Sequence, residues 1–421
     1  MRRFCFALLF FAAAFGFAQE NTGASPDSEL PPSDNIITGI QITGLVRTKP
    51  HIAAAVLEKF RGKDAANINL KDVNAAIEDT GILDPQSVEI VDSPSGAGKT
   101  LSVTVKDKWS FFPAPFGMWN SDGWMVGAAV YEGNAFGIND RAIFAGTYSQ
   151  NGTWFVMGLY QHKESGKFPG FSVNINFENE NMEHKDRGGN VYRRYNINSL
   201  RVALGANYPF AENLNAALRV RFYNAWLGAM DNEMLKPDSG RMALEVRQEI
   251  SWRTKDWDGL LLSERNITAA YNINAALDGS PIVNRLSLHA IWEQPIREGF
   301  RFTAKAGVLW MPSSTPLTEA DPSTAGVDIL PGRFTASGYA GLQAGFENAL
   351  FRIKYGTVSA MATYQIVYSH SELLGGSFDH GPSAALRFFL RGFAVPAIGV
   401  KVSYNINASN FLWTVSMGVE F

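Results

Sequence analysis

The sequence predicts a transmembrane β-barrel of about sixteen antiparallel strands, preceded by one small α+β domain. Apolar and polar residues alternate with a period of two through most of the chain after residue 110. After residue 18, no apolar run is long enough for a transmembrane helix. A membrane protein without such helices must close its strands into a barrel, because backbone groups would otherwise stay unpaired in lipid.

Residues 1–18 are typical of a secretory signal peptide. Two arginines precede the apolar run Phe4–Phe15, and Gly16 and Ala18 supply the small residues that signal peptidase requires. An uncleaved membrane anchor is the alternative, but the run is short for a span and polar residues follow it at once. We therefore expect cleavage after Ala18 and a flexible, proline-containing linker at 19–34.

The composition argues against several function classes. The one cysteine, Cys5, lies in the expected signal, so a mature chain would have no disulfide and no cysteine-based metal site. Without the two signal arginines, 35 of the 37 basic residues remain against 40 acidic ones, a net charge of −5. Such a balance offers no basic surface for nucleic acid.

No pattern of residues points to catalysis or to a cofactor. The sequence shows no nucleophile, paired-carboxylate or metal-ligand arrangement, so we expect no enzyme. The six histidines have no metal-ligand spacing. His370 and His380 flank one expected outer loop and could bind a metal by chance, but we interpret them as solvated loop histidines. Ser93–Thr100 ends like a phosphate-binding loop, but a strand rather than a helix follows it, which indicates a hairpin turn.

Residues 35–108 predict the small α+β domain, because two helical periods lie between strand-like runs. Polar residues and glycines bound each helix, as helix caps do. The expected elements are a strand at 36–42, a helix from Thr48 to Gly62 with Pro50 in its first turn and Ile52, Val56 and Phe60 inward, a helix from Asn69 to Gly81 with Leu70, Val73 and Ile77 inward, and strands at 88–90 and 101–105.

Residues 109–421 carry the barrel pattern, which is clearest in the last strand. There Phe411, Trp413, Val415, Met417, Val419 and Phe421 share one face, and mostly polar or small residues share the other. The sixteen strands are expected to begin near Phe111, Gly123, Ala142, Trp154, Phe171, Tyr195, Leu214, Met242, Leu260, Val283, Arg301, Tyr339, Val358, Pro382, Ala397 and Phe411.

An even number of strands brings both barrel ends to one side of the membrane, where the small domain must lie. The connections then sort by length into short inner turns and long outer loops. The long outer loops are expected at Glu178–Arg194, a solvated segment rich in both charges, at Ala225–Gly240 and at Met311–Gly338.

Several motifs resemble those of one family. Ile40–Thr48, Thr80–Leu83 and Leu101–Lys108 resemble parts of a polypeptide-transport-associated (POTRA) domain, although another small α+β domain is the alternative. Gly133–Gly137 resembles the inner turn near the barrel start of the BamA/TamA family, also called bacterial surface antigens. With the strand count and the terminal Phe421, the resemblance covers residues 36–421 and implies an outer-membrane barrel with a periplasmic N-terminal domain.

The resemblance also implies a lumen anchor in the sixth outer loop. The family carries an Arg-Gly-Phe/Tyr motif there, whose arginine meets an acidic residue inside the barrel. Here that loop contains Gly332, Arg333 and Phe334, with glycine and arginine exchanged, while a literal match at Leu390–Phe393 falls in an expected inner turn. We favour Arg333, although Val358–Ser369, the expected thirteenth strand, offers no clear acidic partner.

A proline pair predicts a weak closing seam. Pro113 and Pro115 lie two apart in the first barrel strand, so one edge of that strand lacks two N–H donors. If this edge faces the last strand, with Phe411 and Phe421, the seam is weak and would suit a lateral gate. The alternative is that Phe111–Phe116 is only a linker.

The expected function is folding, insertion or export of outer-membrane polypeptides. Unfolded polypeptides and outer-membrane lipids would be the partners, together with accessory periplasmic proteins or lipoproteins. The family's central members usually carry several POTRA domains, and residues 35–108 have length for one, which favours an accessory member. The alternative is a passive outer-membrane channel or a surface adhesin.

Overall fold

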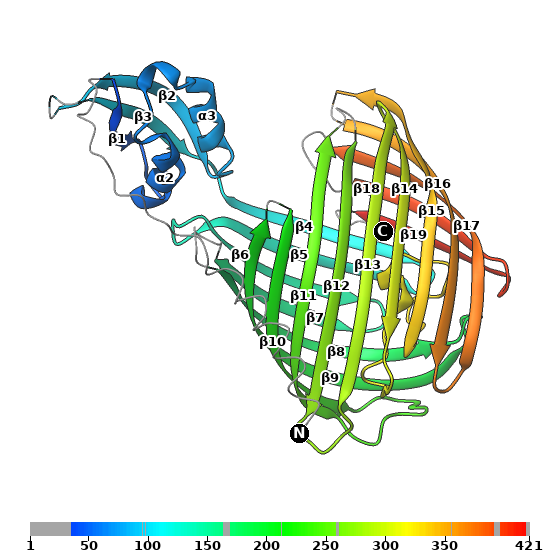
Figure 1. The fold of residues 1–421 in the computed structure, drawn as a ribbon. Coiled ribbons are helices and arrows are strands. Elements are labelled where there is room, and N and C mark those ends of the chain that lie inside the picture. The colour runs from blue at the N-terminus through cyan, green and yellow to red at the C-terminus, as the bar shows by residue number, and fades with distance from the viewer. Residues whose placement is uncertain are drawn as a thin grey trace.

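The computed structural model describes residues 35–94, 96, 98–162, 169–211, 213–257, 261–354, 356–390 and 396–417. These residues form a small α+β domain beside a closed β-barrel (Figure 1). The expected signal peptide at 1–18, the linker at 19–34 and Phe421 lie outside the described residues.

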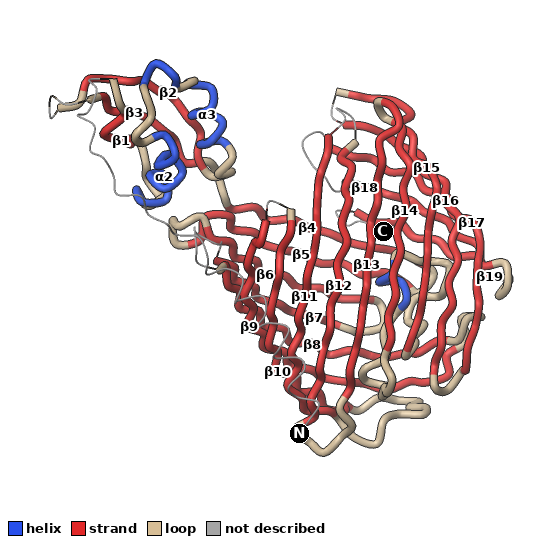
Figure 2. The backbone as a smooth tube through the Cα atoms, viewed as in Figure 1, coloured by secondary structure: helices blue, strands red, loops and turns tan. Residues whose placement is uncertain are grey.

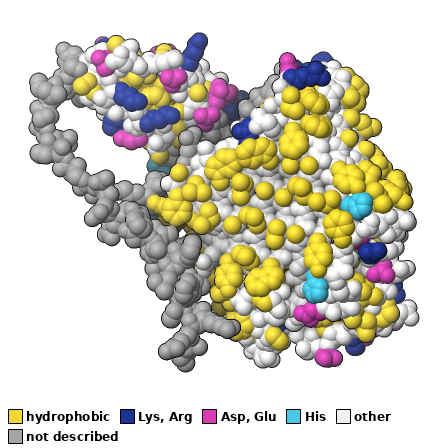
Figure 3. All heavy atoms as spheres, turned by 45° about the vertical axis from the view of Figure 1, so that its right-hand side comes forward, with side chains coloured by type: hydrophobic (Ala, Val, Ile, Leu, Met, Phe, Trp, Pro, Cys, Tyr) yellow, Lys and Arg dark blue, Asp and Glu magenta, His cyan; other side chains and the backbone are white. Residues whose placement is uncertain are grey.

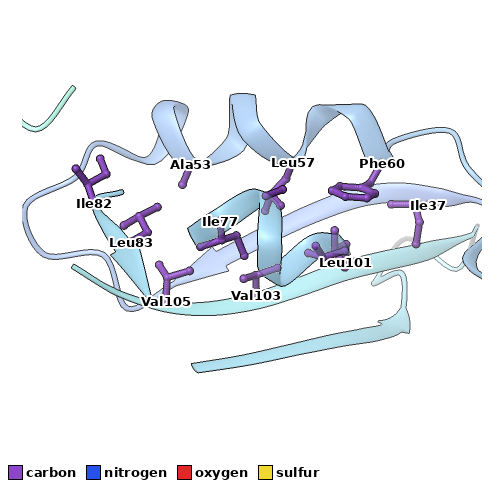
Figure 4. Packing of buried hydrophobic residues seen from close by; sticks show 12 residues of the cluster. Ile37, Ala53, Leu57, Phe60, Ile77, Ile82, Leu83, Leu101, Val103 and Val105 are labelled. Carbon is purple, nitrogen blue, oxygen red and sulfur yellow. The ribbon is translucent and has the colours of Figure 1, made fainter. Parts of the chain in front are cut away.

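The small domain is a β-sheet covered on one face by helices. Its sheet has the order β1-β3-β2, with β1 parallel and β2 antiparallel to β3. The elements are β1 (Ile37–Thr43), α2 (Pro50–Leu57), α3 (Leu70–Glu78), β2 (Leu83–Asp92) and β3 (Lys99–Asp107), with short 3-10 turns at Glu58–Phe60 and Ala65–Asn67. Figure 4 shows Leu57, Phe60 and Ile77 directed toward Leu101 and Val103 of β3.

The helices of this domain differ from expectation at two positions. Asn69 caps α3 as expected, accepting a 3.0 Å hydrogen bond from the Lys71 N–H, but Leu70 is exposed rather than inward. Helix α2 is capped by Lys49 instead of Thr48. The Thr48 hydroxyl is unable to cap because it bonds the carboxylate of Asp107 on β3.

The barrel closes through sixteen antiparallel strands in the described residues, each paired with its neighbours in sequence and the last, β19, paired with the first, β4. Figure 2 shows this wall as a continuous ring of strands. The strands are β4 (Phe111–Asn120), β5 (Gly123–Ala135), β6 (Asp140–Ser149), β7 (Trp154–His162), β8 (Gly170–Lys185), β9 (Val191–Ala211), β10 (Leu214–Gly228), β11 (Arg241–Trp257), β12 (Leu262–Ala276), β13 (Val283–Arg297), β14 (Phe300–Trp310), β15 (Gly338–Ile353), β16 (Gly356–Ser371), β17 (Gly375–Leu390), β18 (Pro396–Asn405) and β19 (Asn410–Met417).

The two faces of the wall differ in polarity. On β16, Tyr364, Ile366 and Tyr368 are exposed outward, whereas the alternate residues Thr363 and Gln365 are buried inside. Hydrophobic side chains gather over the outer wall in Figure 3. An apolar exterior around a polar lumen is the architecture of outer-membrane barrels. Among the described residues, no helix is long and apolar enough to cross a membrane.

Two expected boundaries were wrong. Glu178–Arg194 is no loop, because β8 continues to Lys185 and β9 begins at Val191. The fourteenth strand, β17, begins at Gly375 rather than Pro382. In the first case the hairpin carries polar residues on both faces, so the sequence loses its alternation although the backbone stays paired.

The core of the small domain makes a testable prediction. Leu101 is fully buried in it, so Leu101→Ala should destabilise the domain by about 2–5 kcal/mol through lost burial and a residual cavity. Limited proteolysis of the full-length protein in vesicles, followed by the rate of cleavage within residues 35–108, measures this loss. Leu70→Ala is the matched control, because Leu70 is 39% exposed, and equal cleavage rates in the two variants would contradict the prediction.

Candidate functional site: lumen loop and barrel seam

The loop between β14 and β15, Met311–Ser337, folds into the barrel. Its short helix η3 (Pro322–Ala325) lies inside the ring of strands in Figure 2. The loop pairs with itself where the amide groups of Ala320 and Ala336 exchange hydrogen bonds of 2.9 Å. Val327 and Ile329 are fully buried in an apolar cluster that also holds Leu309 and Val367 from the wall. The loop is therefore a packed element of the lumen.

Arg333 binds one side of the lumen wall. Its guanidinium Nη1 donates to the Asn181 carbonyl at 3.2 Å and lies 3.6 Å from Glu183 Oε2, both on β8. The Arg333 backbone has a positive φ of 68°, and its carbonyl accepts from the Lys185 N–H at 3.2 Å. The predicted arginine thus meets an acid, but on the fifth strand instead of the thirteenth.

The neighbours of Arg333 are both constrained by packing. A Cβ at Gly332 would lie 2.1 Å from Asp122 Oδ2, so any other residue there would require this carboxylate to move. Phe334 is 3% exposed and belongs to the apolar cluster of the loop. The literal motif match at Leu390–Phe393 falls largely outside the described residues.

A second loop residue, Asp328, binds the other side of the wall. Its backbone N–H donates to Gln365 Oε1 at 2.8 Å, and its carboxylate accepts from Gln365 Nε2 at 2.5 Å. The same carboxylate forms an ion pair with Lys401 and accepts from the Ser403 hydroxyl at 3.2 Å. One residue on, the Ile329 carbonyl accepts from Asn405 Nδ2 at 3.1 Å. Asp328 was not predicted from the sequence. The available signal was Lys401, a basic residue on the polar face of its strand that needs an acidic partner inside the barrel.

A third contact buries a charged cluster between the loop and β8–β9. Glu319 accepts from Thr335 Oγ1 at 2.9 Å and from Arg193 Nη1 at 3.3 Å, and it lies 3.6 Å from His184 Nδ1. His184 is 1% exposed, so the expectation of a solvated loop histidine was wrong. The error follows from the misplaced strand end, because the extended β8 turns His184 inward.

These contacts tie opposite walls of the barrel together. Arg333 binds β8, the fifth barrel strand, and Asp328 binds Gln365 on β16, the thirteenth of sixteen. The strands lie half a circumference apart, so the loop crosses the lumen. On this side the loop supplies the acidic residue, Asp328, and the wall supplies Gln365 on the thirteenth strand and Lys401 on the fifteenth. The family resemblance implied the opposite, with a basic residue on the loop and an acidic residue on the wall.

The closing seam joins β19 to β4. The described part of β19 ends at Met417 and pairs with Gly117–Asn120 of β4, and β4 pairs with β5 along Phe111–Asn120. The Ser110 carbonyl accepts from the Gly133 N–H, which places the backbone groups of even-numbered residues toward β5. The backbone nitrogens of Pro113 and Pro115 therefore face the seam edge. Phe111–Phe116 belongs to β4, so it is a strand rather than a linker.

Aromatic side chains lie along the seam where it is paired. Trp119 of β4 and Trp413 of β19 meet edge to face across it, with ring centroids 5.4 Å apart. Phe411 is paired with Tyr404 of β18 and is 58% exposed on the wall. Phe421 lies outside the described residues. Among the side chains that the structure describes, no group of three or more His, Cys, Asp or Glu could hold a metal ion.

Solved structures share the overall fold of this chain. The chain matches BamA from Haemophilus ducreyi lacking POTRA domains 1–3 with a TM-score of 0.65, covering 91% of this chain and 84% of that one at 11% identity. The chain has a BamA-like fold. It also matches CdiB from Escherichia coli (TM-score 0.62, 13% identity, 91% of this chain and 76% of that one). CdiB from Acinetobacter baumannii gives a TM-score of 0.61 at 12% identity, over 91% of this chain and 73% of that one.

No family model and no curated protein matches the sequence itself. The BamA-like fold is thus carried by barrel topology and the adjoining small domain, at identities of 11–13%. Strand alternation tolerates many residue choices on each face, so the fold persists where the sequence has diverged.

The wall partners of the two loop anchors differ in burial, which predicts unequal effects. Asp328→Ala would leave Lys401, 5% exposed, without its counter-ion, and removing one partner of such a pair costs about 3 kcal/mol. Arg333→Ala removes a longer, more exposed contact and should cost about 1 kcal/mol. The rate of protease cleavage within Met311–Ser337 in reconstituted protein measures loop release.

The charge exchange Asp328→Lys with Lys401→Asp is the matched control and should recover part of the protection. Equal cleavage rates for Asp328→Ala and wild type would contradict the Asp328 anchor. If Arg333→Ala leaves folding, abundance and activity unchanged, Arg333 is no anchor.

Proposed function

We propose that this protein acts in outer-membrane biogenesis, where it folds, inserts or exports polypeptides, with the small domain in the periplasm. The BamA-like fold supports this class of role. The observation that carries the proposal is the seam, because the alternation of β4 directs Pro113 and Pro115, which lack N–H donors, toward β19. A barrel wall that only separates two compartments has no need of such an edge.

An open seam would offer a template for a client strand. Once the seam has opened, the edge of β4 that faces β19 could pair with an extended polypeptide by strand addition, in which backbone hydrogen bonds give affinity without requiring one sequence. Beside it, β1 and β2 form the two edges of the small sheet and could hold the same client earlier. Outer-membrane lipids would receive the inserted product, and periplasmic proteins or lipoproteins would supply it.

We further propose that the protein is an accessory member of the machinery, on the basis of the one small α+β domain among the described residues. Residues 35–108 form one α+β unit next to the barrel, and we interpret it as a POTRA domain. The lumen-crossing loop disfavours the alternative of a passive channel, because Arg333 and Asp328 hold it between opposite walls. The charge and composition support no nucleic-acid, nucleotide or metal partner.

Depletion of the protein tests the function. If it assembles or exports polypeptides, depletion should lower the abundance of a subset of outer-membrane proteins while inner-membrane proteins stay constant, as measured by quantitative proteomics of separated membranes. An unchanged outer-membrane proteome, combined with a stable open pore in planar bilayers, would favour the channel instead.

A disulfide across the seam tests the gate. Met118 and Ser416 are register partners on β4 and β19 and, by the alternation of β4, form a non-hydrogen-bonded pair. Cα atoms in such pairs are about 4.5 Å apart, within the range of a disulfide. Met118→Cys with Ser416→Cys should crosslink in membranes and abolish activity until a reductant is added.

The control disulfide joins two strands inside the wall. The hydroxyls of Ser369 and Ser377, on β16 and β17, lie 2.9 Å apart, so Ser369→Cys with Ser377→Cys should crosslink without loss of activity. Full activity of the oxidised seam pair would contradict a lateral gate.

A further inference from the structure

Two short segments that carried the family resemblance meet in the structure. Gly44–Thr48, the second half of Ile40–Thr48, lies in the small domain between β1 and α2, and Gly133–Gly137 leads into the turn between β5 and β6. The Lys49 N–H donates to the Gly137 carbonyl at 2.8 Å, which joins the two backbones directly. Neither the seam nor the lumen loop uses these segments.

Asp107 orders the first segment from within the small domain. Its carboxylate accepts from the N–H groups of Val46, Arg47 and Thr48 at 2.7–3.1 Å and from the Thr48 hydroxyl. Burial raises the pKa of Asp107, but these hydrogen bonds outweigh it, so the pKa lies below its ordinary value. The carboxylate therefore stays charged at neutral pH and holds Arg47 and Thr48 toward the barrel.

Thr48 and Asn134 form the buried centre of the contact. Asn134 Nδ2 donates to Thr48 Oγ1 at 2.8 Å, and the two residues are 2–3% exposed. Asn134 also receives the Asn139 N–H on its Oδ1 at 2.9 Å, which fixes the turn around it. A buried amide with its donor and acceptor both used tolerates little change of angle, because a lost bond would leave a polar atom unpaired.

Arg47 adds a second connection, to the chain that leads into the seam strand. Its Nη1 donates to Ser110 Oγ at 3.0 Å and its Nη2 to Glu132 Oε2 at 2.9 Å. Ser110 in turn donates to Glu132 Oε1 at 2.5 Å and immediately precedes β4. The small domain is thereby bonded both to the β5–β6 turn and to the start of β4.

Steric fit and chain length restrict the contact further. Gly137 has a φ of 74°, and a Cβ there would lie 2.2 Å from the Arg47 carbonyl oxygen. The connection between β3, which ends at Asp107, and β4, which begins at Phe111, is short. A swing of the small domain would therefore have to break the bonds of Thr48 and Arg47 together.

We propose that these residues form a rigid joint, which holds the small domain in one orientation and presents a bound polypeptide to the periplasmic start of β4. The joint comprises Arg47, Thr48, Asp107, Ser110, Glu132, Asn134 and Gly137. The presentation of a client rests on the proposed function, whereas the rigidity rests on the contacts alone.

Distance measurement between two spin labels tests the rigidity. The labels are placed by Val91→Cys, exposed on β2, and Glu298→Cys, exposed on the turn after β13, in full-length protein with Cys5→Ser reconstituted in vesicles. Electron–electron double resonance should give one narrow distance distribution. Thr48→Val and Arg47→Ala should each broaden it, and together they should produce more than one population.

Matched controls come from the same domain. Thr43→Val removes a hydroxyl bonded to Thr104, and Arg61→Ala removes a guanidinium bonded to Glu58, and neither partner belongs to the barrel. Both controls should keep the narrow distribution. A broad distribution in the wild type, or a narrow one in the Thr48→Val and Arg47→Ala double variant with the barrel folded, would overturn the joint.

The delivery role has a separate readout. In a deletion strain, Thr48→Val should restore outer-membrane protein levels less well than Thr43→Val when both barrels are equally abundant. If Thr48→Val broadens the distances yet restores those levels fully, the joint stands and its role in delivery is refuted. If depletion of the wild type alters no outer-membrane protein, the proposed function fails, while the distance result still decides the joint.

Discussion

Closure of the β-sheet is the constraint on which the rest of the structure depends. In lipid, every strand N–H and C=O needs a partner within the wall, since water is absent. Fifteen of the sixteen strand contacts in the described wall satisfy this between neighbours in sequence, and the contact between β19 and β4 must satisfy it over the largest sequence separation. Strand β4, whose two prolines lack N–H donors, stands at that contact.

The polar lumen follows from the same closure and creates a second problem. Side chains that alternate away from lipid point into the barrel, where many are charged and partly shielded from water. The loop Met311–Ser337 supplies counter-ions to basic residues of this wall, because its Asp328 pairs with Lys401 and its Glu319 with Arg193. Because these partners lie on separated strands, the loop also braces the wall, and its apolar cluster packs against Leu309 and Val367 of the wall.

The small domain is bonded directly to the segments next to the seam. Arg47 and Thr48 bond the chain just before β4 and the turn after β5, the two strands nearest the seam on that side. The lumen loop reaches the same region from inside, since Lys185, whose amide bonds the Arg333 carbonyl, pairs with Asp122 in the turn after β4. Both ends of β4 are thus held by polar contacts, while its seam edge carries Pro113 and Pro115, which lack N–H donors.

The sequence by itself determined the fold class, the number of strands and most of their starting points. Period-two alternation indicates which residues face lipid. This pattern lies within each strand, so it can be read without knowing which strands pair or which side chains meet. It failed at Glu178–Arg194, where the strands continue with polar residues on both faces, and at Gly375, where glycines and polar residues begin β17.

Only the tertiary structure decided which side chains meet. Arg333 was found from its loop, but its partner Glu183 and the anchor formed by Asp328 join strands half a barrel apart. Thr48 has the composition of a helix cap, yet a carboxylate and an amide from distant segments take its hydroxyl. The physical reason is that propensity and periodicity act over a few residues, whereas ion pairs and buried hydrogen bonds are selected by the closed shape of the barrel.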